Sequence, residues 1–217
     1  NIFDPRNIAT FAGYSLDFFI NDKLIESQQL RYRDIFHKPP QEIYSDKTDS
    51  PFFNYYEFFH KNIYAHIDFS FFETVIDIGA NIGLFSIYAH TMGVKNILAV
   101  EPGQKAFRAL KVNSFPGLTI ENCAISTEDG SLILYETEEN STITAFRQRN
   151  WVGDFGKITK ISVSSLSIKS LLSKHKLEKV NLLKMDIKCL EYTVLQSIEP
   201  EIFNKIDNLL IEFHDNN

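Results

Sequence analysis

The stretch Val75-Ile76-Asp77-Ile78-Gly79-Ala80-Asn81-Ile82-Gly83 decides the fold of this chain. A β-branched apolar run carries an acidic residue at its end and breaks into a turn with two glycines, after which apolar residues recur at helical spacing. Gly93 is placed to stop that helix. A second apolar run, residues 97–100, is followed by Glu101, which lies 24 positions after Asp77. The pattern predicts a strand, turn, helix and second strand that hold a nucleoside-containing cofactor.

The spacing of the glycines favours one cofactor over another. A dinucleotide turn reads Gly-x-Gly-x-x-Gly and holds a pyrophosphate at the helix N-terminus. Here the glycines stand only at positions 79 and 83, and the Asp77 carboxylate would repel a pyrophosphate but attract an ammonium group. S-adenosylmethionine has an ammonium group, a carboxylate and a ribose but no phosphate, so it fits better than NAD. A nicotinamide oxidoreductase and an unrelated strand–turn–helix protein remain as alternatives.

Composition and charge are those of a soluble enzyme with one substantial core. The chain has 217 residues, of which 44% are hydrophobic and 23% charged. Its formal net charge of −6 argues against a nucleic-acid partner. No apolar run is long enough to span a membrane and no signal-peptide pattern opens the sequence, so we expect a cytoplasmic protein. Cys123 and Cys189 lack metal-ligand spacing, and we therefore expect no metal site.

Two regions are expected. Residues 1–62 form a mixed N-terminal extension, which ends in an aromatic helix candidate, residues 52–63, whose Glu57 and His60 are candidates for lining the site. Residues 63–217 form the cofactor-binding domain. Its strands and helices alternate, which predicts an α/β fold with a mostly parallel, doubly wound sheet that binds ligands at the C-terminal ends of its strands.

Further elements of this domain follow from local patterns. A third strand, residues 118–125, carries Cys123-Ala124 at its tip. Two β-rich runs, residues 131–136 and 157–163, flank a polar segment, residues 138–150, and together predict an inserted β-hairpin beside the substrate. The remaining expected elements are helices at 103–114, 167–175 and around 190–198, and strands at 180–187 and 208–213.

Together these residues resemble the FkbM family of S-adenosylmethionine-dependent methyltransferases. The resemblance runs from residue 55 to residue 214 and rests on five segments in consistent order: VIDIGANIGLFSIYA (75–89), AVEPGQKAFRALKVN (99–113), CAIS (123–126), LLKMDIKCLEYTVL (182–195) and LLIEFH (209–214). It implies a Rossmann-like class I methyltransferase fold and, in most members, methylation of oxygen, often on sugar-derived or polyketide hydroxyls.

Carried over position by position, the resemblance assigns roles to individual residues. The methionine part of the cofactor would be held by Asp77, Gly79, Asn81 and Gly83, the ribose by Glu101 with Pro102 beside it, and the adenine by Cys123 and Ala124. Asp186 matches the family's acid at the fourth strand tip and Glu191 the glutamate just inside the next helix. For the general base that a hydroxyl acceptor needs, the order of preference is Asp186, Glu191 and His214, all near strand ends that border the site.

The sequence departs from the family in two ways. A glutamate, a glycine and often an alanine usually follow the Asp-x pair, whereas this chain has Lys188, Cys189 and Leu190. The lysine reverses a charge beside the acceptor pocket, which leaves a non-catalytic S-adenosylmethionine-binding module as the alternative function. The usual fold also adds two strands as an antiparallel edge, and we expect these to be missing from this sequence.

The sequence therefore predicts an S-adenosylmethionine-dependent methyltransferase that acts on a hydroxyl of a small-molecule or carbohydrate acceptor. Neither the identity of that acceptor nor an oligomeric state follows from the residues.

Overall fold

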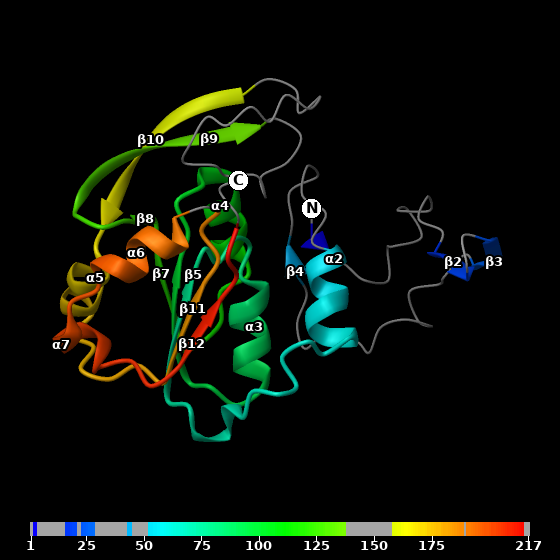
Figure 1. Cartoon of the computed structure of the whole chain (residues 1–217), viewed down its shortest axis with the longest axis horizontal. Coiled ribbons are helices and arrows are strands. Elements are labelled where there is room, and N and C mark those ends of the chain that lie inside the picture. Colours follow the sequence, from blue (N-terminus) through cyan, green and yellow to red (C-terminus); the bar gives the residue numbers. More distant parts are fainter. Residues whose placement is uncertain are drawn as a thin grey trace.

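A five-stranded parallel sheet forms the centre of the molecule (Figure 1). The computed structural model describes residues 2–3, 16–20, 23–28, 43–44, 52–137, 158–188 and 190–214. The strands lie in the order β12-β11-β5-β6-β7, and all four pairings are parallel. Their bounds are β5 (Thr74–Ile78), β6 (Asn96–Val100), β7 (Leu118–Glu121), β11 (Leu182–Met185) and β12 (Leu209–Ile211). The predicted α/β class is confirmed, and the strand order reverses between β5 and β11, where such sheets bind ligands.

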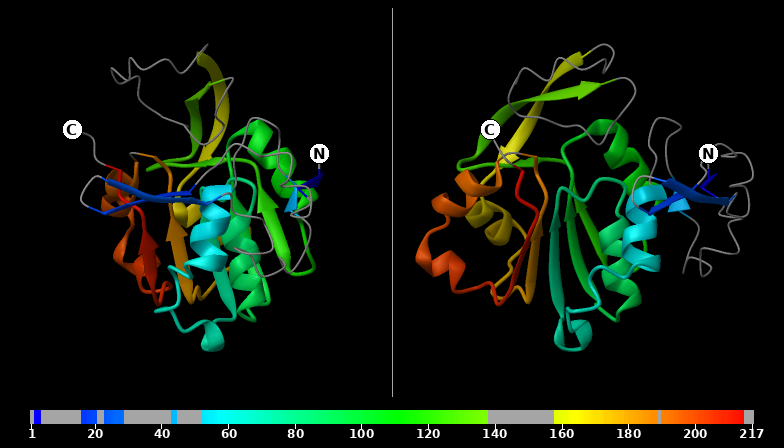
Figure 2. Two further views of the ribbon diagram at one scale, coloured as in Figure 1. Left: turned by 90° about the vertical axis from the view of Figure 1, so that its right-hand side faces the viewer. Right: turned by 45° about the vertical axis from the view of Figure 1, so that its right-hand side comes forward.

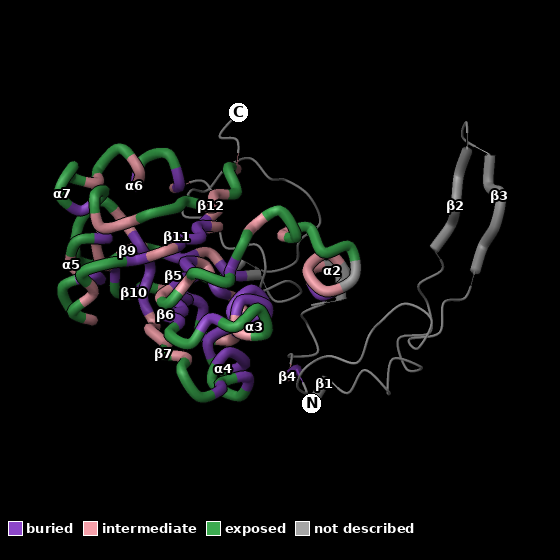
Figure 3. Tube along the Cα trace, turned by 90° about the horizontal axis from the view of Figure 1, so that it is seen from below, coloured by how far each residue is buried: buried purple, intermediate pink, exposed green. Residues whose placement is uncertain are grey.

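Helices cover both faces of this sheet (Figure 2). On one face lie α3 (Leu84–Thr91) and α4 (Gln104–Val112). On the other lie α5 (Ile168–Lys174), α6 (Glu191–Ser197) and α7 (Pro200–Phe203). Alternate strand residues are therefore buried on opposite faces, and the sheet forms the buried centre of the burial-coloured trace (Figure 3).

The aromatic segment before the sheet packs on α3. It forms α2 (Phe52–Tyr55), a π-helical turn η2 (Tyr56–His60) and, further on, the short helix η3 (Phe69–Phe71). Tyr55 is buried in the same core cluster as Tyr88 of α3, and the rings of Phe59 and Tyr88 lie 5.6 Å apart. The regular helix expected over 52–63 is thus shorter and partly π-helical, and the side chains of Tyr55, Phe58 and Phe59 pack in the core.

Two small antiparallel pairs lie in the N-terminal region. β1 (Ile2–Phe3) pairs with β4 (Ile43–Tyr44), and β2 (Leu16–Ile20) pairs with β3 (Lys23–Gln28). Ile43 is fully buried in the same cluster as Tyr55 and α3. The boundary between residues 62 and 63 remains a prediction, and core packing crosses it.

The structure has a second sheet of three strands, and one strand expected from the sequence divides between the two sheets. The run predicted as one strand, residues 118–125, divides into β7 and β8 (Ala124–Ile125). β8 leaves the main sheet and pairs in parallel with β10 (Ile158–Leu166). At the point of departure the side-chain amide of Asn122 donates to the carbonyls of Glu101 and Pro102. β10 pairs antiparallel with β9 (Gly130–Thr137), which confirms the inserted hairpin. The polar segment 138–150 lies outside the described residues.

A buried ion pair joins the two strands at the point where the order reverses. Lys184 of β11 stands directly opposite Asp77 of β5 in the parallel register, and Lys184 Nζ lies 3.0 Å from Asp77 Oδ1. The Lys184 side chain is 9% exposed and that of Asp77 is fully buried. Burial alone would lower the pKa of Lys184, but the nearby carboxylates of Asp77 and Asp186 outweigh it and raise that pKa, so the lysine is a cation.

The same pair fixes the turn above it. Lys184 Nζ also donates to the carbonyl of Gly79 at 3.1 Å, and the hydroxyl of Ser86 in α3 donates to Asp77 Oδ2 at 2.8 Å. The ring of Phe85 lies 5.8 Å from the ammonium. Through these contacts the buried Lys184–Asp77 pair holds β5, the glycine turn and α3 to β11.

Removing the lysine should destabilise the fold strongly. We expect Lys184→Met to lower the free energy of unfolding by about 3–5 kcal/mol, because the Asp77 carboxylate would remain buried without its cation. Urea unfolding of Lys184→Met, Asp77→Asn and the double variant measures this. The double variant should lose less stability than the sum of the two single losses, and strictly additive losses would contradict the pairing.

Candidate active site

The glycine turn lies in close contact with the end of β11. Gly79 has a φ of +75°, and a Cβ built on it would lie 1.9 Å from the carbonyl oxygen of Asp186. The amides of Gly79 and Ala80 donate to the carbonyl of Val100 at 2.9 and 3.0 Å. The turn is therefore clamped between the ends of β6 and β11, and only glycine fits at position 79.

Asn81 presents a buried oxygen to this turn. Its backbone is left-handed, with a φ of +51°, and its N–H donates to Glu101 Oε2 at 2.9 Å. Its side-chain oxygen Oδ1 is buried and has no hydrogen-bond partner among the residues that the structure describes. A buried acceptor without a donor is costly, and an ammonium or hydroxyl group of a ligand would satisfy it.

Glu101 lies at the tip of β6 and is 6% exposed. Its two oxygens accept the N–H groups of Asn81, at 2.9 Å, and Gly103, at 2.7 Å. Burial raises the pKa of Glu101 to about 7, although these two bonds act in the opposite direction. Each carboxylate oxygen has a second lone pair, so both can still accept a hydroxyl hydrogen.

The predicted adenine residues lie where the chain passes from β7 of the main sheet to β8 of the second sheet. Glu136 lies nearby, close to Glu101. Cys123 and Ala124 are buried at the start of β8, and burial raises the pKa of the Cys123 thiol to about 11, so it stays neutral. Glu136 of β9, which the sequence did not single out, is also buried. A Cβ built on Gly103 would lie 2.9 Å from Glu101 Oε1 and 3.1 Å from Glu136 Oε1, so both carboxylates flank that glycine.

All three candidate bases gather beyond the ends of β11 and β12. His214 Nδ1 lies 2.9 Å from Glu191 Oε1, and that same oxygen accepts the N–H of Ile187 at 3.0 Å. Lys188 Nζ lies 2.8 Å from Asp186 Oδ1 and 2.8 Å from His214 Nε2. Asp186, Glu191 and His214 thus form one cluster, although they are up to 28 positions apart in the sequence.

These contacts determine the tautomer of His214. The ammonium of Lys188 can only donate, so His214 Nε2 must be the acceptor. The ring proton then lies on Nδ1 and is donated to Glu191, which is buried at 2% exposure. A buried carboxylate thus orients the imidazole of His214, with Nε2 directed away from that carboxylate and toward Lys188.

Its surroundings make Asp186 a weaker base than an ordinary aspartate. Burial acts to raise its pKa, but the ammonium groups of Lys184 and Lys188 outweigh burial and lower it. A carboxylate held ionised by two cations takes up a proton poorly near neutral pH.

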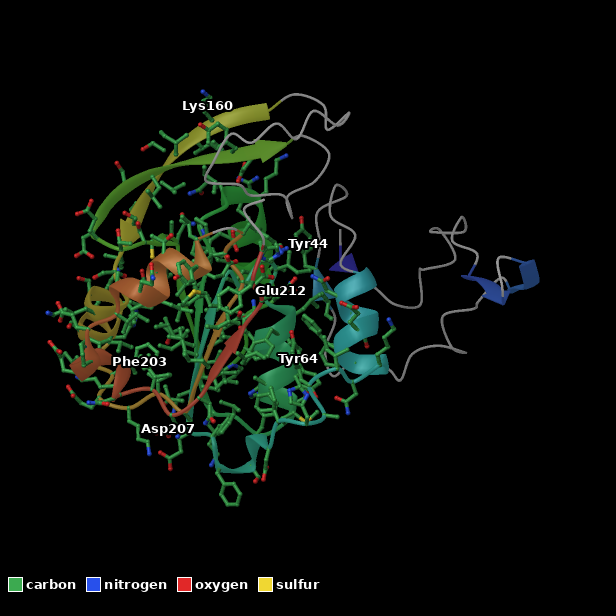
Figure 4. All side chains as sticks on the ribbon, viewed as in Figure 1. Tyr44, Tyr64, Lys160, Phe203, Asp207 and Glu212 are labelled. Atoms are coloured by element: carbon green, nitrogen blue, oxygen red, sulfur yellow. The ribbon has the colours of Figure 1, made fainter. Side chains whose placement is uncertain are left out.

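Two residues near this cluster were missed from the sequence. Tyr64 packs edge-on against Phe85, 5.2 Å between ring centroids, and lies beside α3 in Figure 4. Burial raises its pKa to about 12, so its hydroxyl stays protonated. Lys184 carried a usable signal, since a lysine stands within the apolar strand of β11, whereas Tyr64 carried none.

Glu57 and His60 lie in η2, and the side chain of His60 is outside the described residues. Their lining of the site remains a prediction. The side chain of Cys189, in the departure from the family pattern, is also outside them.

The residues of the glycine turn fit S-adenosylmethionine. The unsatisfied Asn81 oxygen suits the ammonium of the methionine part, and Glu101 suits the ribose hydroxyls. The carboxylate of Asp77 contacts Lys184 and Ser86 below the turn. Its contact with the cofactor remains a prediction.

Comparisons with known proteins show the family. The model of the methyltransferase FkbM domain family matches residues 77–217, which is more than half of the chain. Methyltransferase 1 of Beauveria bassiana is 27% identical over 184 residues, covering 73% of this chain and 74% of that protein.

Two further matches cover smaller parts of the chain. The ribosomal protein L11 methyltransferase of Staphylococcus saprophyticus is 37% identical over 87 residues, which are 39% of this chain and 26% of that enzyme. A solved structure of an S-adenosylmethionine-dependent methyltransferase from Listeria monocytogenes is 16% identical, with 52% of this chain and 81% of that chain covered and a TM-score of 0.29.

The raised pKa of Glu101 predicts a pH-dependent stability. Its pKa is about 7 in the folded chain against an ordinary value of 4.5, so the folded state keeps a proton that the unfolded state releases between those values. Its contribution to stability is full below about pH 4.5 and is lost as the pH rises through about 7. The melting temperature of the wild type minus that of Glu101→Gln should therefore fall between pH 5 and pH 8.

Thermal melts without cofactor measure this difference. Glu178→Gln, which changes an 85% exposed carboxylate, is the matched control and should show little pH dependence relative to the wild type. A difference for Glu101→Gln that stays constant or grows with pH would refute the assignment.

Proposed function

We propose that this chain, which belongs to the FkbM methyltransferase family, methylates a hydroxyl oxygen of a small-molecule or sugar-derived acceptor. It is an S-adenosylmethionine-dependent methyltransferase, since the family model and the methyltransferase relatives agree. The observation that supports an oxygen acceptor is the His214–Glu191 pair at the ligand-binding edge of the sheet. A hydroxyl has a high pKa and needs such a base.

The cofactor would be held along the glycine turn. We assign the methionine part to Gly79, Asn81 and Gly83, the ribose to Glu101 beside Pro102, and the adenine to Cys123 and Ala124. S-adenosylmethionine supplies a methyl group already activated on a sulfonium centre, so the chain mainly has to align the acceptor with it. The contact between Gly79 and Asp186 supports this, because it brings the cofactor turn next to the base cluster.

His214 is the base in this proposal. The acceptor hydroxyl would replace Lys188 at His214 Nε2 and give its proton to that nitrogen. Glu191, already bonded to Nδ1, would hold the ring in place and stabilise the imidazolium that forms. Asp186 would retain Lys188 through their 2.8 Å contact while the acceptor is bound.

The partners and location are proposals of the same kind. The net charge of −6 supports a small acceptor rather than a nucleic acid. None of the helices in the described ranges combines the length and apolar character that crossing a bilayer requires. We propose a cytoplasmic enzyme in which residues 63–217 carry the chemistry and residues 1–62 are an extension of that domain.

Transfer of a labelled methyl group tests the function. The protein is incubated with methyl-labelled S-adenosylmethionine and a metabolite extract, and labelled products are separated and identified. We expect the wild type to form a labelled methyl ether. The variant His214→Gln should form it roughly 100-fold or more slowly, because the base is lost. Cofactor affinity, measured by calorimetry, should be nearly unchanged in that variant.

Glu101→Gln is the complementary variant. It should weaken S-adenosylmethionine binding by roughly 1.5–3 kcal/mol, because the ribose hydroxyls lose a charged acceptor. Unchanged affinity in a folded protein would reject the ribose assignment. Tight cofactor binding with no labelled product from any extract would favour the non-catalytic binding module, and equal rates in the wild type and His214→Gln would reject His214 as the base.

A further inference from the structure

The base cluster has the ligand set of a divalent cation site. Asp186, Glu191 and His214 each present one ligand atom, and these atoms lie within 4.8 Å of one another. Two carboxylates and an imidazole are a common set for Mn²⁺ and Zn²⁺. Glu212 adds a carboxylate, with Oε1 3.4 Å from His214 Nε2.

The chain already places a cation among these atoms. Lys188 Nζ lies 2.8 Å from both Asp186 Oδ1 and His214 Nε2. A metal ion bound to the same two atoms would lie at about 2.0–2.2 Å from each of them. It would therefore occupy nearly the same space as the ammonium and be repelled by its charge, so the two cannot be present together.

The backbone supports this placement. Lys188 has a left-handed backbone, with a φ of +54°, in the turn between β11 and α6. This conformation is unfavourable for a residue other than glycine. Its side chain returns to Asp186, two residues earlier, and is one-third exposed. The position is the one where the family resemblance sets a glutamate, which would add a further ligand instead of a cation.

We propose that Lys188 is an internal cation that takes the place of a divalent metal ion in the Asp186–Glu191–His214 cluster. The other nearby ammonium, that of Lys184, is paired with Asp77 and Gly79 below the turn. Lys188 thus balances the carboxylates at this edge and contacts His214 Nε2. The inference concerns the resting cluster and holds whichever acceptor the proposed function uses.

Titration with Mn²⁺, followed by electron paramagnetic resonance, tests the proposal without any methyl-transfer assay. The wild type should show no saturable Mn²⁺ site at the cluster. Lys188→Glu, which removes the cation and adds a carboxylate, should bind one Mn²⁺ per chain roughly tenfold or more tightly than any wild-type binding. Lys188→Met, which removes only the charge, should bind more weakly than Lys188→Glu but more tightly than the wild type.

Two further variants locate the effect. Lys95→Glu makes the same charge change on an exposed residue just before β6, at the N-terminal ends of the strands and thus away from the cluster. It should leave Mn²⁺ binding as in the wild type. Adding His214→Ala to Lys188→Glu should abolish the new site. Circular dichroism and thermal melts with and without Mn²⁺ establish that each variant is folded.

Either of two results would overturn the proposal. One is saturable Mn²⁺ binding by the wild type that His214→Ala removes, because the lysine would then not exclude the metal. The other is a folded Lys188→Glu or Lys188→Met chain that binds Mn²⁺ no more tightly than the wild type. The first result needs no Lys188 variant, so the proposal can fail even if these variants do not fold.

Discussion

The buried ion pair between Lys184 and Asp77 is the interaction on which the rest of the site depends. It joins β11 to β5 at the one place where the sheet reverses its strand order, and it reaches the carbonyl of Gly79 and, through Asp77, the hydroxyl of Ser86. Two charges inside a protein are tolerated only when they are paired and their remaining hydrogen-bonding capacity is used. Because Lys184 also bonds the carbonyl of Gly79, the glycine turn is held in one position relative to β11.

This position brings two kinds of chemistry together. In the function proposed above, the Gly79 turn, Asn81 and Glu101 would hold the cofactor, whereas His214 and Glu191 would face the acceptor. Gly79 lies directly against the end of β11, so little space separates the two sides. A reaction that depends mainly on alignment gains from such a rigid and short connection.

Charge is distributed unevenly across this edge. Burial raises the pKa of Glu101 to about 7 against its two backbone hydrogen bonds, whereas two ammonium groups lower the pKa of Asp186. Carboxylates thus acquire different properties from their surroundings, and His214 lies beside a lysine. Sequence patterns identify the acids but do not show which of them are paired.

The sequence by itself determined the class of fold, the cofactor turn and the inserted hairpin, because each depends on local order: apolar periodicity, glycine spacing and the acid at a strand end. It also placed Asp186, Glu191 and His214 near one edge, since parallel strands end together. Only the tertiary structure decided that Asp77 bonds Lys184, that Asn122 directs the chain into a second sheet, and that Lys188 lies between Asp186 and His214. These contacts join residues from separate strands and turns, and their geometry depends on register and side-chain direction, which local patterns do not contain.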